Sequence, residues 1–145
     1  MPEVRPLRHN DRAQWLELRQ QLHPDYRIDV HEDEIALVLN DPLEAGFGAF
    51  ESEDLVGFIE VSERPWGEGC ETAPVGWIEN LLVVSDSRMA GIGRRLVDAT
   101  ANWSRLRGLS ELGSDVVFEY ETSLITHARW GFEETMRLVM FRKRL

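Results

Sequence analysis

The sequence predicts an α/β fold in which a mixed, mostly antiparallel central sheet is flanked by helices. A nearly continuous apolar run at residues 75–84 is typical of a central strand that is covered on both faces. An amphipathic helical pattern follows at residues 92–106, and two β-like runs at 46–51 and 55–62 flank a polar turn, which favours a hairpin. With 145 residues, of which 43% are hydrophobic, we expect one domain over residues 1–145.

The first half of the chain is expected to start the sheet and to carry two helices. Residues 4–7 are typical of a short strand, Asn10-Asp11 then caps a helix that ends before Pro24, and a second, shorter helix is expected at 32–39. The apolar face of the first helix consists of Trp15, Leu16, Leu18 and Leu22. Residues 63–74 predict a long loop rich in Gly, Pro, Glu and Trp, and such a loop in a compact domain is more often functional than idle.

The second half alternates strands and helices. Glu79 interrupts the apolar run of the central strand, and a polar turn at 85–93 leads into the amphipathic helix, which Gly108 ends. The remaining predicted elements are a strand at 109–117, a helix at 121–129 that ends at Gly131, and a last strand at 132–142.

The charge balance disfavours nucleic acid as a partner. The chain has 16 basic and 26 acidic side chains, a formal net charge of −10, and a sequence pI near 4.8. Such a surface repels phosphate backbones and attracts polycations, although acidity that serves only solubility is the simpler interpretation. Only carboxylates placed together in a site would distinguish the two.

Other features of the composition narrow the class of protein further. No stretch approaches the length of a membrane-spanning helix and the start lacks a signal-peptide pattern, so we expect a cytoplasmic protein without membrane attachment. Cys70 is the only cysteine, which excludes an internal disulfide, and no basic neighbour activates it as a nucleophile. The four histidines lack metal-ligand spacing, so no metal site and no covalent intermediate are predicted.

The turn at residues 88–93 is the strongest local signal for a ligand. It lies between a predicted buried strand and an amphipathic helix, where successive backbone N–H groups and the positive end of the helix can converge on an anion. Glycine is needed where a side chain would block that approach, and Gly91 and Gly93 stand there. This arrangement predicts a phosphate or pyrophosphate site, while a purely structural turn remains the alternative.

The wider pattern, Leu81-x-Val83 followed by Arg88-x-x-Gly91-x-Gly93, resembles the acetyl-CoA signature of the GNAT superfamily. The resemblance implies the GNAT fold, splayed near Glu79 and Arg88. It also implies that the strand backbone at Leu81 and Val83 pairs with the pantetheine arm, while amides of the turn hold the pyrophosphate. The turn residues carried over by position are Arg88, Met89, Ala90, Gly91, Ile92, Gly93 and Arg94. Ala90 departs from the basic residue common in that family, which predicts slightly weaker cofactor binding.

Further landmarks are similar to those of the aminoglycoside 6′-N-acetyltransferases. They are Gly69-Cys70-Glu71, Pro74-Val75, Ile78-Glu79, Ser114-Asp115, the run at 131–135, and the closing Phe141-Arg142-Lys143-Arg144. The resemblance implies transfer of acetyl from acetyl-CoA to the 6′-amine of an aminoglycoside, a small cationic substrate, in a ternary complex. Homodimers are common among similar enzymes. Two alternatives stay open: acetylation of a polyamine, small amine or protein amino group, and a non-catalytic acetyl-CoA sensor.

Three residues are the candidates for catalysis. Glu79, a carboxylate inside an apolar strand, is suited to accept the proton of the attacking ammonium directly or through water, and a structural carboxylate is the alternative. By resemblance, Asp115 lies near the amine and either binds the ammonium or shares the base role. His127 stands where many GNAT enzymes carry the tyrosine that protonates the leaving thiolate, although a neutral histidine hydrogen-bonded on its helix fits equally well.

The resemblance also implies a substrate pocket in the long loop. Glu71 would pair with an ammonium group and Trp66 would pack on a sugar face, with a simple loop anchor as the alternative for Trp66. His23 stands where the similar enzymes usually have tryptophan, and Met136 where they often have an acidic residue. Both departures predict a narrower set of aminoglycosides.

Overall fold

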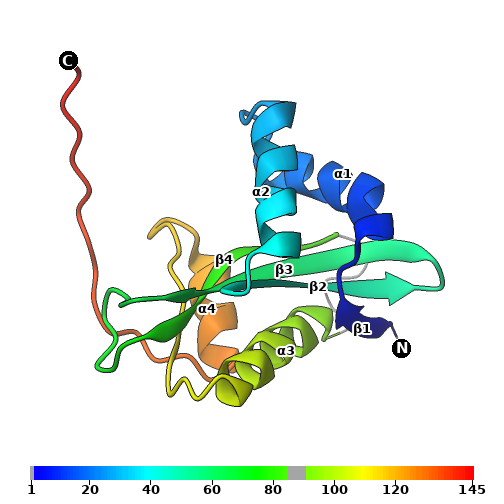
Figure 1. Cartoon of the computed structure of the whole chain (residues 1–145). Coiled ribbons are helices and arrows are strands. Elements are labelled where there is room, and N and C mark those ends of the chain that lie inside the picture. Colours follow the sequence, from blue (N-terminus) through cyan, green and yellow to red (C-terminus); the bar gives the residue numbers. More distant parts are fainter. Residues whose placement is uncertain (1, 85–90) are drawn as a thin grey trace.

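The computed structural model describes residues 2–84 and 91–145, and over these it has a mixed sheet with helices on both faces (Figure 1). The strands are β1 (Glu3–Pro6), β2 (Glu44–Glu51), β3 (Asp54–Arg64), β4 (Val75–Val83) and β5 (Leu112–Gly113). The helices are a short 3-10 turn (His9–Asp11), α1 (Arg12–Leu22), α2 (Ile28–Asn40), α3 (Ile92–Leu106) and α4 (Glu121–Arg129). The sheet order is β1-β2-β3-β4-β5, antiparallel except for the parallel β4–β5 pair. The predicted fold class is confirmed.

Helices α1 and α2 cover one face of the sheet, and α3 and α4 lie on the other (Figure 1). Alternation along the strands divides the core in the same way, because successive side chains point to opposite faces. Phe58 packs with α1 and α2, while its neighbour Ile59 packs on the side of α3. The buried stripe of α3 contains Ile92, Leu96, Val97 and Thr100, as the helical period predicts.

A polar network is buried between α1, α2 and the sheet. Arg19 of α1 is 0% exposed and donates to both carboxylate oxygens of Glu60 of β3, which is itself 2% exposed. Trp15 also donates to Glu60, at 2.8 Å, and the Arg19 Nε donates to His31 of α2 at 3.2 Å. Glu34 of α2 pairs with the same guanidinium. Because a buried charge needs a partner, this network determines how α1 and α2 sit on the sheet.

Two predicted strands differ from the structure. The segment expected to be a strand at 109–117 forms only a two-residue ladder, Leu112–Gly113, against β4. The last strand, expected at 132–142, is absent, and the chain there extends away from the sheet (Figure 1) with its large apolar side chains exposed. Its sequence has strand character, but a strand forms only when another strand pairs with it, and no strand among the described residues does so.

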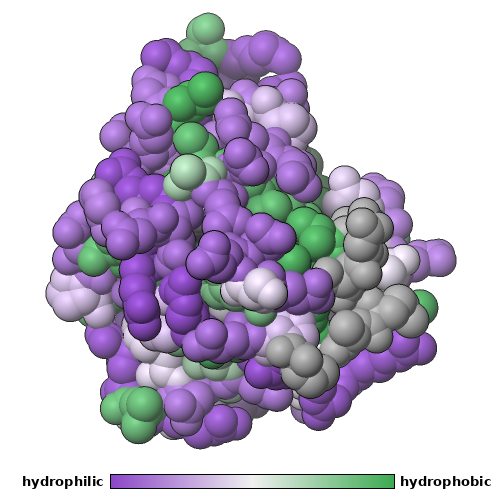
Figure 2. Space-filling model, turned by 90° about the vertical axis from the view of Figure 1, so that its right-hand side faces the viewer, coloured by the Kyte–Doolittle hydropathy of each residue, from purple (hydrophilic) through white to green (hydrophobic). Residues whose placement is uncertain are grey.

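The helices were predicted more closely than the last strands. Helix α4 has the predicted bounds, and α3 ends where Gly108 takes up a positive φ of 79°. Helix α2 starts at Ile28, four residues before the expected start, because the short connection from α1 turns directly into it. None of the helices in the described part of the chain is long and apolar enough to cross a membrane. The face shown in Figure 2 is mainly hydrophilic, with several separate apolar groups on it.

Replacing Arg19 with methionine should destabilise the fold strongly. Arg19→Met keeps much of the volume but leaves the Glu60 carboxylate buried without its counter-ion, which costs about 3–5 kcal/mol of unfolding free energy. The matched control is Arg27→Met, because Arg27 pairs with Asp29 at 2.8 Å on the exposed surface. An exposed pair contributes about 0–1 kcal/mol, so the control should melt close to the parent. Equal losses for the two variants in urea unfolding would contradict a structural role for the buried pair.

Candidate active site

Glu79 lies at a β-bulge in the middle of β4. The pairing of β3 with β4 runs from Gly57↔Val83 to Glu60↔Asn80 and then shifts to Val61↔Ile78, so that Glu79 is the extra residue on β4. A bulge of this kind turns a side chain away from its regular direction. As a result Glu79 and Asn80 both reach side chains of β3 that belong to the α1–α2 face, Glu79 meeting Ser62 and Asn80 meeting Glu60.

The carboxylate of Glu79 accepts three hydrogen bonds. Ser62 Oγ donates to Oε1 at 2.6 Å, and Arg64 donates to Oε1 at 2.8 Å and to Oε2 at 2.7 Å. The Arg64 and Glu79 side chains are 40% and 31% exposed, so this bidentate pair is open to solvent. A carboxylate has about four acceptor positions, which leaves one on Oε2 for a further donor such as an ammonium group.

Arg64 was not expected from the sequence, yet it connects the two predicted acids. Its guanidinium lies over the Trp77 ring, 4.7 Å from the ring centroid. The hydrogen bonds to Glu79 raise the pKa of Arg64, and the charges of Glu79 and Asp115 raise it further. Asp115, which is exposed, therefore lies within electrostatic reach of Arg64.

Glu44, at the start of β2, is a second acid that sequence reasoning missed. It pairs with Ser62 in the sheet and so belongs to the same row of polar side chains. Burial raises the pKa of the Glu44 carboxyl, and the neighbouring negative charges, including those of Glu79 and Glu60, raise it further. Nothing local in the sequence marks Glu44, because its surroundings come from three different strands and a helix.

His23 ends α1 directly beside this row. Asn80 donates to Glu60 at 2.8 Å, so its carbonyl oxygen is the acceptor for His23 Nε2 at 2.7 Å. The His23 ring stacks on Tyr26, with 4.5 Å between centroids and 8° between planes. His23, which stands where the similar enzymes usually have tryptophan, is thus hydrogen-bonded to Asn80, the residue next to Glu79. His23 therefore forms part of the wall of the site.

The sheet opens on the far side of Glu79. Strand β5 pairs with β4 only at Gly76 and Trp77, so the edge of β4 beyond Trp77 is not covered by β5. The Val84 amide, directly after β4, donates to the Val56 carbonyl of β3 at 2.9 Å. Because backbone groups alternate sides along a strand, Leu81 directs its N–H and C=O toward the edge of β4 that β5 does not reach. This is the geometry expected for pairing with a linear ligand.

The turn predicted to hold the pyrophosphate is described only in part, since Arg88, Met89 and Ala90 lie outside the described residues. Gly91 precedes α3 with a φ of 72°, and a Cβ there would meet nothing within 4 Å. The side chains of the next residues have other tasks. Ile92 is buried in the core, so only its backbone amide is available to an anion, while the exposed Arg94 donates from one guanidinium nitrogen to the Arg129 carbonyl at 3.2 Å.

Gly93 is required for packing rather than for ligand approach alone. A Cβ at Gly93 would lie 2.7 Å from the Trp130 ring, too close for any side chain. Trp130 follows α4, so the absence of a side chain at Gly93 lets α3 and α4 meet under the sheet. The structure thus gives Gly93 a packing reason that the sequence did not show, and its role in ligand approach stays a prediction.

The long loop is anchored by an acid outside it. Glu111 Oε1 accepts from the Glu71 amide at 2.8 Å, from the Thr72 amide at 2.6 Å, and from the Thr72 hydroxyl at 2.5 Å. These bonds hold the pKa of Glu111 below its usual range. The predicted pocket residues Glu71 and Trp66 are both exposed, Trp66 to 61%. Burial, together with the charge of Glu111, raises the pKa of the Cys70 thiol, which disfavours thiolate chemistry there.

His127 is hydrogen-bonded through both ring nitrogens. Its Nδ1 lies 2.7 Å from the Ser123 carbonyl, which can only accept, so Nδ1 carries the proton. Its Nε2 then accepts from the Ser114 hydroxyl at 2.9 Å. Ser114 directly precedes Asp115, so His127 connects α4 to the segment that carries this predicted acid. Neutral His127 in this arrangement has no proton on Nε2 to donate.

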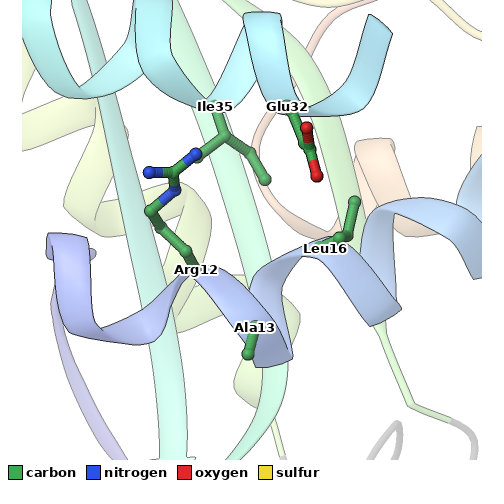
Figure 3. A pocket seen from close by; sticks show the side chains of 5 residues that line it. All are labelled: Arg12, Ala13, Leu16, Glu32 and Ile35. Atoms are coloured by element: carbon green, nitrogen blue, oxygen red, sulfur yellow. The ribbon is translucent and has the colours of Figure 1, made fainter. Parts of the chain in front are cut away.

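Two surface hollows lie outside this row of polar side chains. One, of about 190 Å³, lies between α1 and α2 and is lined by Arg12, Ala13, Leu16, Glu32 and Ile35 (Figure 3). The other, of about 430 Å³, is lined by Leu43, Glu63, Pro65, Ala73 and Pro74, at the base of the long loop. Neither contains a predicted catalytic residue. Within the described ranges, no group of three or more His, Cys, Asp or Glu side chains could hold a metal ion.

Comparison with known proteins was consistent along the chain. The model of the acetyltransferase (GNAT) family matches residues 8–132. An aminoglycoside N(6′)-acetyltransferase type 1 of Klebsiella aerogenes is 35% identical over 99% of this chain and 97% of the relative. The enzyme of the same name from Stenotrophomonas maltophilia is 37% identical over 97% of this chain and 92% of the relative.

Solved structures of aminoglycoside 6′-N-acetyltransferases are also similar to this chain. AAC(6′)-Iy in complex with the bisubstrate analogue CoA-S-monomethyl-acetylneamine superposes with a TM-score of 0.95 at 30% identity, covering 100% of this chain and 99% of that chain. AAC(6′)-Ih from Acinetobacter baumannii has a TM-score of 0.92 at 28% identity, covering 100% of this chain and 99% of that chain.

Proposed function

The chain belongs to the acetyltransferase (GNAT) family, and we propose that it is an aminoglycoside 6′-N-acetyltransferase. It transfers acetyl from acetyl-CoA to the 6′-amine of an aminoglycoside by direct attack in a ternary complex, and residues 1–145 act as one catalytic domain. The amide product has lost a positive charge, which aminoglycosides need to bind ribosomal RNA, so the reaction confers resistance.

One structural observation carries the proposal. Beyond Trp77, β5 no longer pairs with β4, and no other strand of the described residues takes its place along that edge; Glu79 lies where this edge begins, and α3 follows β4 in the chain. A thioester donor that pairs with the edge at Leu81 and directs its phosphates toward the helix would bring its acetyl group near Glu79. The amine then attacks the acetyl carbon, the new N–C bond forms, and the C–S bond breaks.

The amine needs a negative site and a route for its proton. Glu79 takes the proton directly or through water, and Asp115 holds the ammonium or shares the role of base. Glu71 and Trp66, both exposed on the long loop, contribute to the sugar-amine pocket when substrate is bound. The leaving thiolate takes its proton from water or from His127, which can donate from Nε2 only in its imidazolium form.

For acetyl-CoA, the proposal assigns the backbone of Leu81 and Val83 to the pantetheine arm. The pyrophosphate lies against the turn, with Arg88, Met89, Ala90, Gly91, Ile92, Gly93 and Arg94 as the residues that surround it. Because α3 has no acidic residue in its first turn, the positive end of the helix is available to the phosphates. We place the protein in the cytoplasm, where its acetyl donor is found; fractionation of cells that express it tests this.

A homodimer also forms part of the proposal. The C-terminal segment 133–145 has strand-like sequence, and it exposes Leu138, Val139, Met140, Phe141 and Leu145. Strand β5 forms only a two-residue ladder. A second copy of the chain, exchanging this segment beside β5, would pair the backbone and cover the apolar side chains of both.

Thiol release with matched amines tests the function. The protein should release CoA thiol from acetyl-CoA with neamine and not with its 6′-hydroxyl analogue, which lacks the accepting amine. Spermidine and a lysine peptide are included as other amine classes. Thiol release with spermidine or the lysine peptide, and none with neamine, would show that the substrate is another amine and not an aminoglycoside. No release with any of them would favour a binding protein without turnover.

Glu79→Gln tests the proposed base in the same assay. The variant keeps the shape of the side chain and should lower kcat by roughly 10² to 10⁴, the usual contribution of a positioned acid or base. It should also remove the acidic limb of the pH profile of kcat/KM, because the group that titrates there is gone. An early-melting variant that keeps its pH profile would make Glu79 a structural carboxylate.

Gly91→Val and Gly108→Val test the phosphate turn as a matched pair. Both glycines have positive φ, 72° and 79°, with nothing within 4 Å of an added Cβ, and they flank the two ends of α3. Each variant should lose roughly 1–2 kcal/mol of stability to backbone strain. Only Gly91→Val should weaken acetyl-CoA binding, by about tenfold or more, since charge-assisted backbone hydrogen bonds are lost. Equal acetyl-CoA affinities of the two variants in calorimetry would show that the pyrophosphate does not bind at this turn.

Phe141→Asp tests the homodimer. A charge in the exchanged segment should convert a dimer to a monomer in sedimentation velocity, because the side chain would be buried only in the pair. Leu106→Asp is the control, since Leu106 is an equally exposed apolar residue at the end of α3. A monomeric parent protein, or the same dissociation with both variants, would refute the exchange.

A further inference from the structure

Two arginine–glutamate pairs lie on the same face of the sheet, and they differ in access. The Arg19–Glu60 pair is closed, with both side chains at 3% exposure or less. The Arg64–Glu79 pair is open, at 40% and 31%. Both of its partners can be reached by a solute, and an exposed pair of this kind is held only weakly. The carboxylate assigned to the amine is therefore already bound by a cation of the protein itself.

The charges around Arg64 come from several elements. Glu79 of β4 is its direct partner, and the charge of Asp115, in the segment after β5, also acts on it. Glu44 of β2 lies in the same row and senses the charge of Glu79. Glu60 is already matched by Arg19. Arg64 is thus the one cation among the described side chains that bonds to Glu79, and it faces more than one negative group.

We propose that Arg64 is the resident counter-ion of the amine subsite, and that the ammonium group of the substrate competes with it for Glu79. This inference rests on the proposed function, because it names the ammonium of the aminoglycoside as the competitor. Arg64 is a positioning residue: it acts on the substrate through Glu79 and takes no part in bond making.

The geometry allows this exchange of cations. Arg64 holds Glu79 through two hydrogen bonds, and its guanidinium also stacks on Trp77, 4.7 Å from the ring centroid. If an ammonium takes Oε2, the guanidinium keeps the ring and the Nε bond to Oε1, so it need not leave the site. Ser62 continues to donate to Oε1 at 2.6 Å and holds the carboxylate in place.

The competition between Arg64 and the ammonium group ends when the acetyl group is transferred. Acetylation turns the ammonium into a neutral amide, which cannot compete with a guanidinium for a carboxylate. Arg64 then recovers both oxygens of Glu79, which favours release of the product. While the substrate is bound, the nearby positive charge also opposes the ammonium form and so favours loss of the proton that blocks attack.

Calorimetry with Arg64→Gln tests the proposal without turnover. The probes are neamine and its 6′-hydroxyl analogue, each titrated into the protein with CoA in place of acetyl-CoA. Removing the competing charge should tighten neamine about threefold to tenfold, as expected for one charge–charge interaction at a partly exposed site. The hydroxyl analogue should change less. Arg64→Lys keeps the charge and should stay near the parent affinity.

The matched control is Arg107→Gln. Arg107 also pairs with a glutamate of β3, Glu63 at 3.2 Å, and also lies over a tryptophan, Trp103 at 4.7 Å, but it does not contact Glu79. Its removal should leave neamine binding unchanged. In steady state, Arg64→Gln should lower KM for neamine without raising kcat.

Weaker or unchanged neamine binding by Arg64→Gln, in a variant that melts like the parent, would overturn the proposal. So would an equal change for both probes, or the same change with Arg107→Gln. If the parent protein binds neamine but releases no thiol with it, the proposed function fails while the comparison of affinities still decides the role of Arg64.

Discussion

The buried Arg19–Glu60 ion pair is the constraint on which the arrangement of this protein depends. A guanidinium at 0% exposure needs carboxylate partners, and it finds them in Glu60 and Glu34, on β3 and α2. Asn80 also donates to Glu60 Oε2, and the carbonyl oxygen of Asn80 accepts from His23. One charge pair therefore connects α1, α2, β3 and the part of β4 next to the bulge, so the helical layer and the bulge keep a defined relation.

The polar row on β3 changes character along its length. Phe58 is fully buried, Glu60 is buried and paired, Ser62 is buried and donates to Glu79, and Arg64 is open to solvent. These alternate residues share a face, so the row runs from the core, where groups need permanent partners, to the surface, where partners can be exchanged. The permanently paired residues and the residues with exchangeable partners thus differ in their place along one strand and not in residue type.

Strand β4 performs two tasks because its neighbours differ along its length. Near Gly76 and Trp77 it lies between β3 and β5, and beyond them β3 is the only strand of the described residues that pairs with it. The bulge at Glu79 falls where this change occurs, so the side chain that we propose for the amine and the backbone edge that we propose for the acetyl donor meet at one point. The Gly93–Trp130 contact brings α3 together with the end of α4.

The sequence alone determined the elements whose signals are local. Helix α4, strand β4, helix α3, and the choice of Glu79 as an unusual carboxylate all followed from periodicity and polarity within a few residues, while the turn between β4 and α3 lies mostly outside the described residues. The family resemblance added Asp115 and His127. Tertiary structure decided the rest: that Glu79 occupies a bulge, that Arg64 and Ser62 hold it, that Glu44 shares its field, and that residues 132–142 form no strand within the described part of the chain. These depend on strand register and on partners distant in sequence, and a shift of one residue changes which face a side chain occupies.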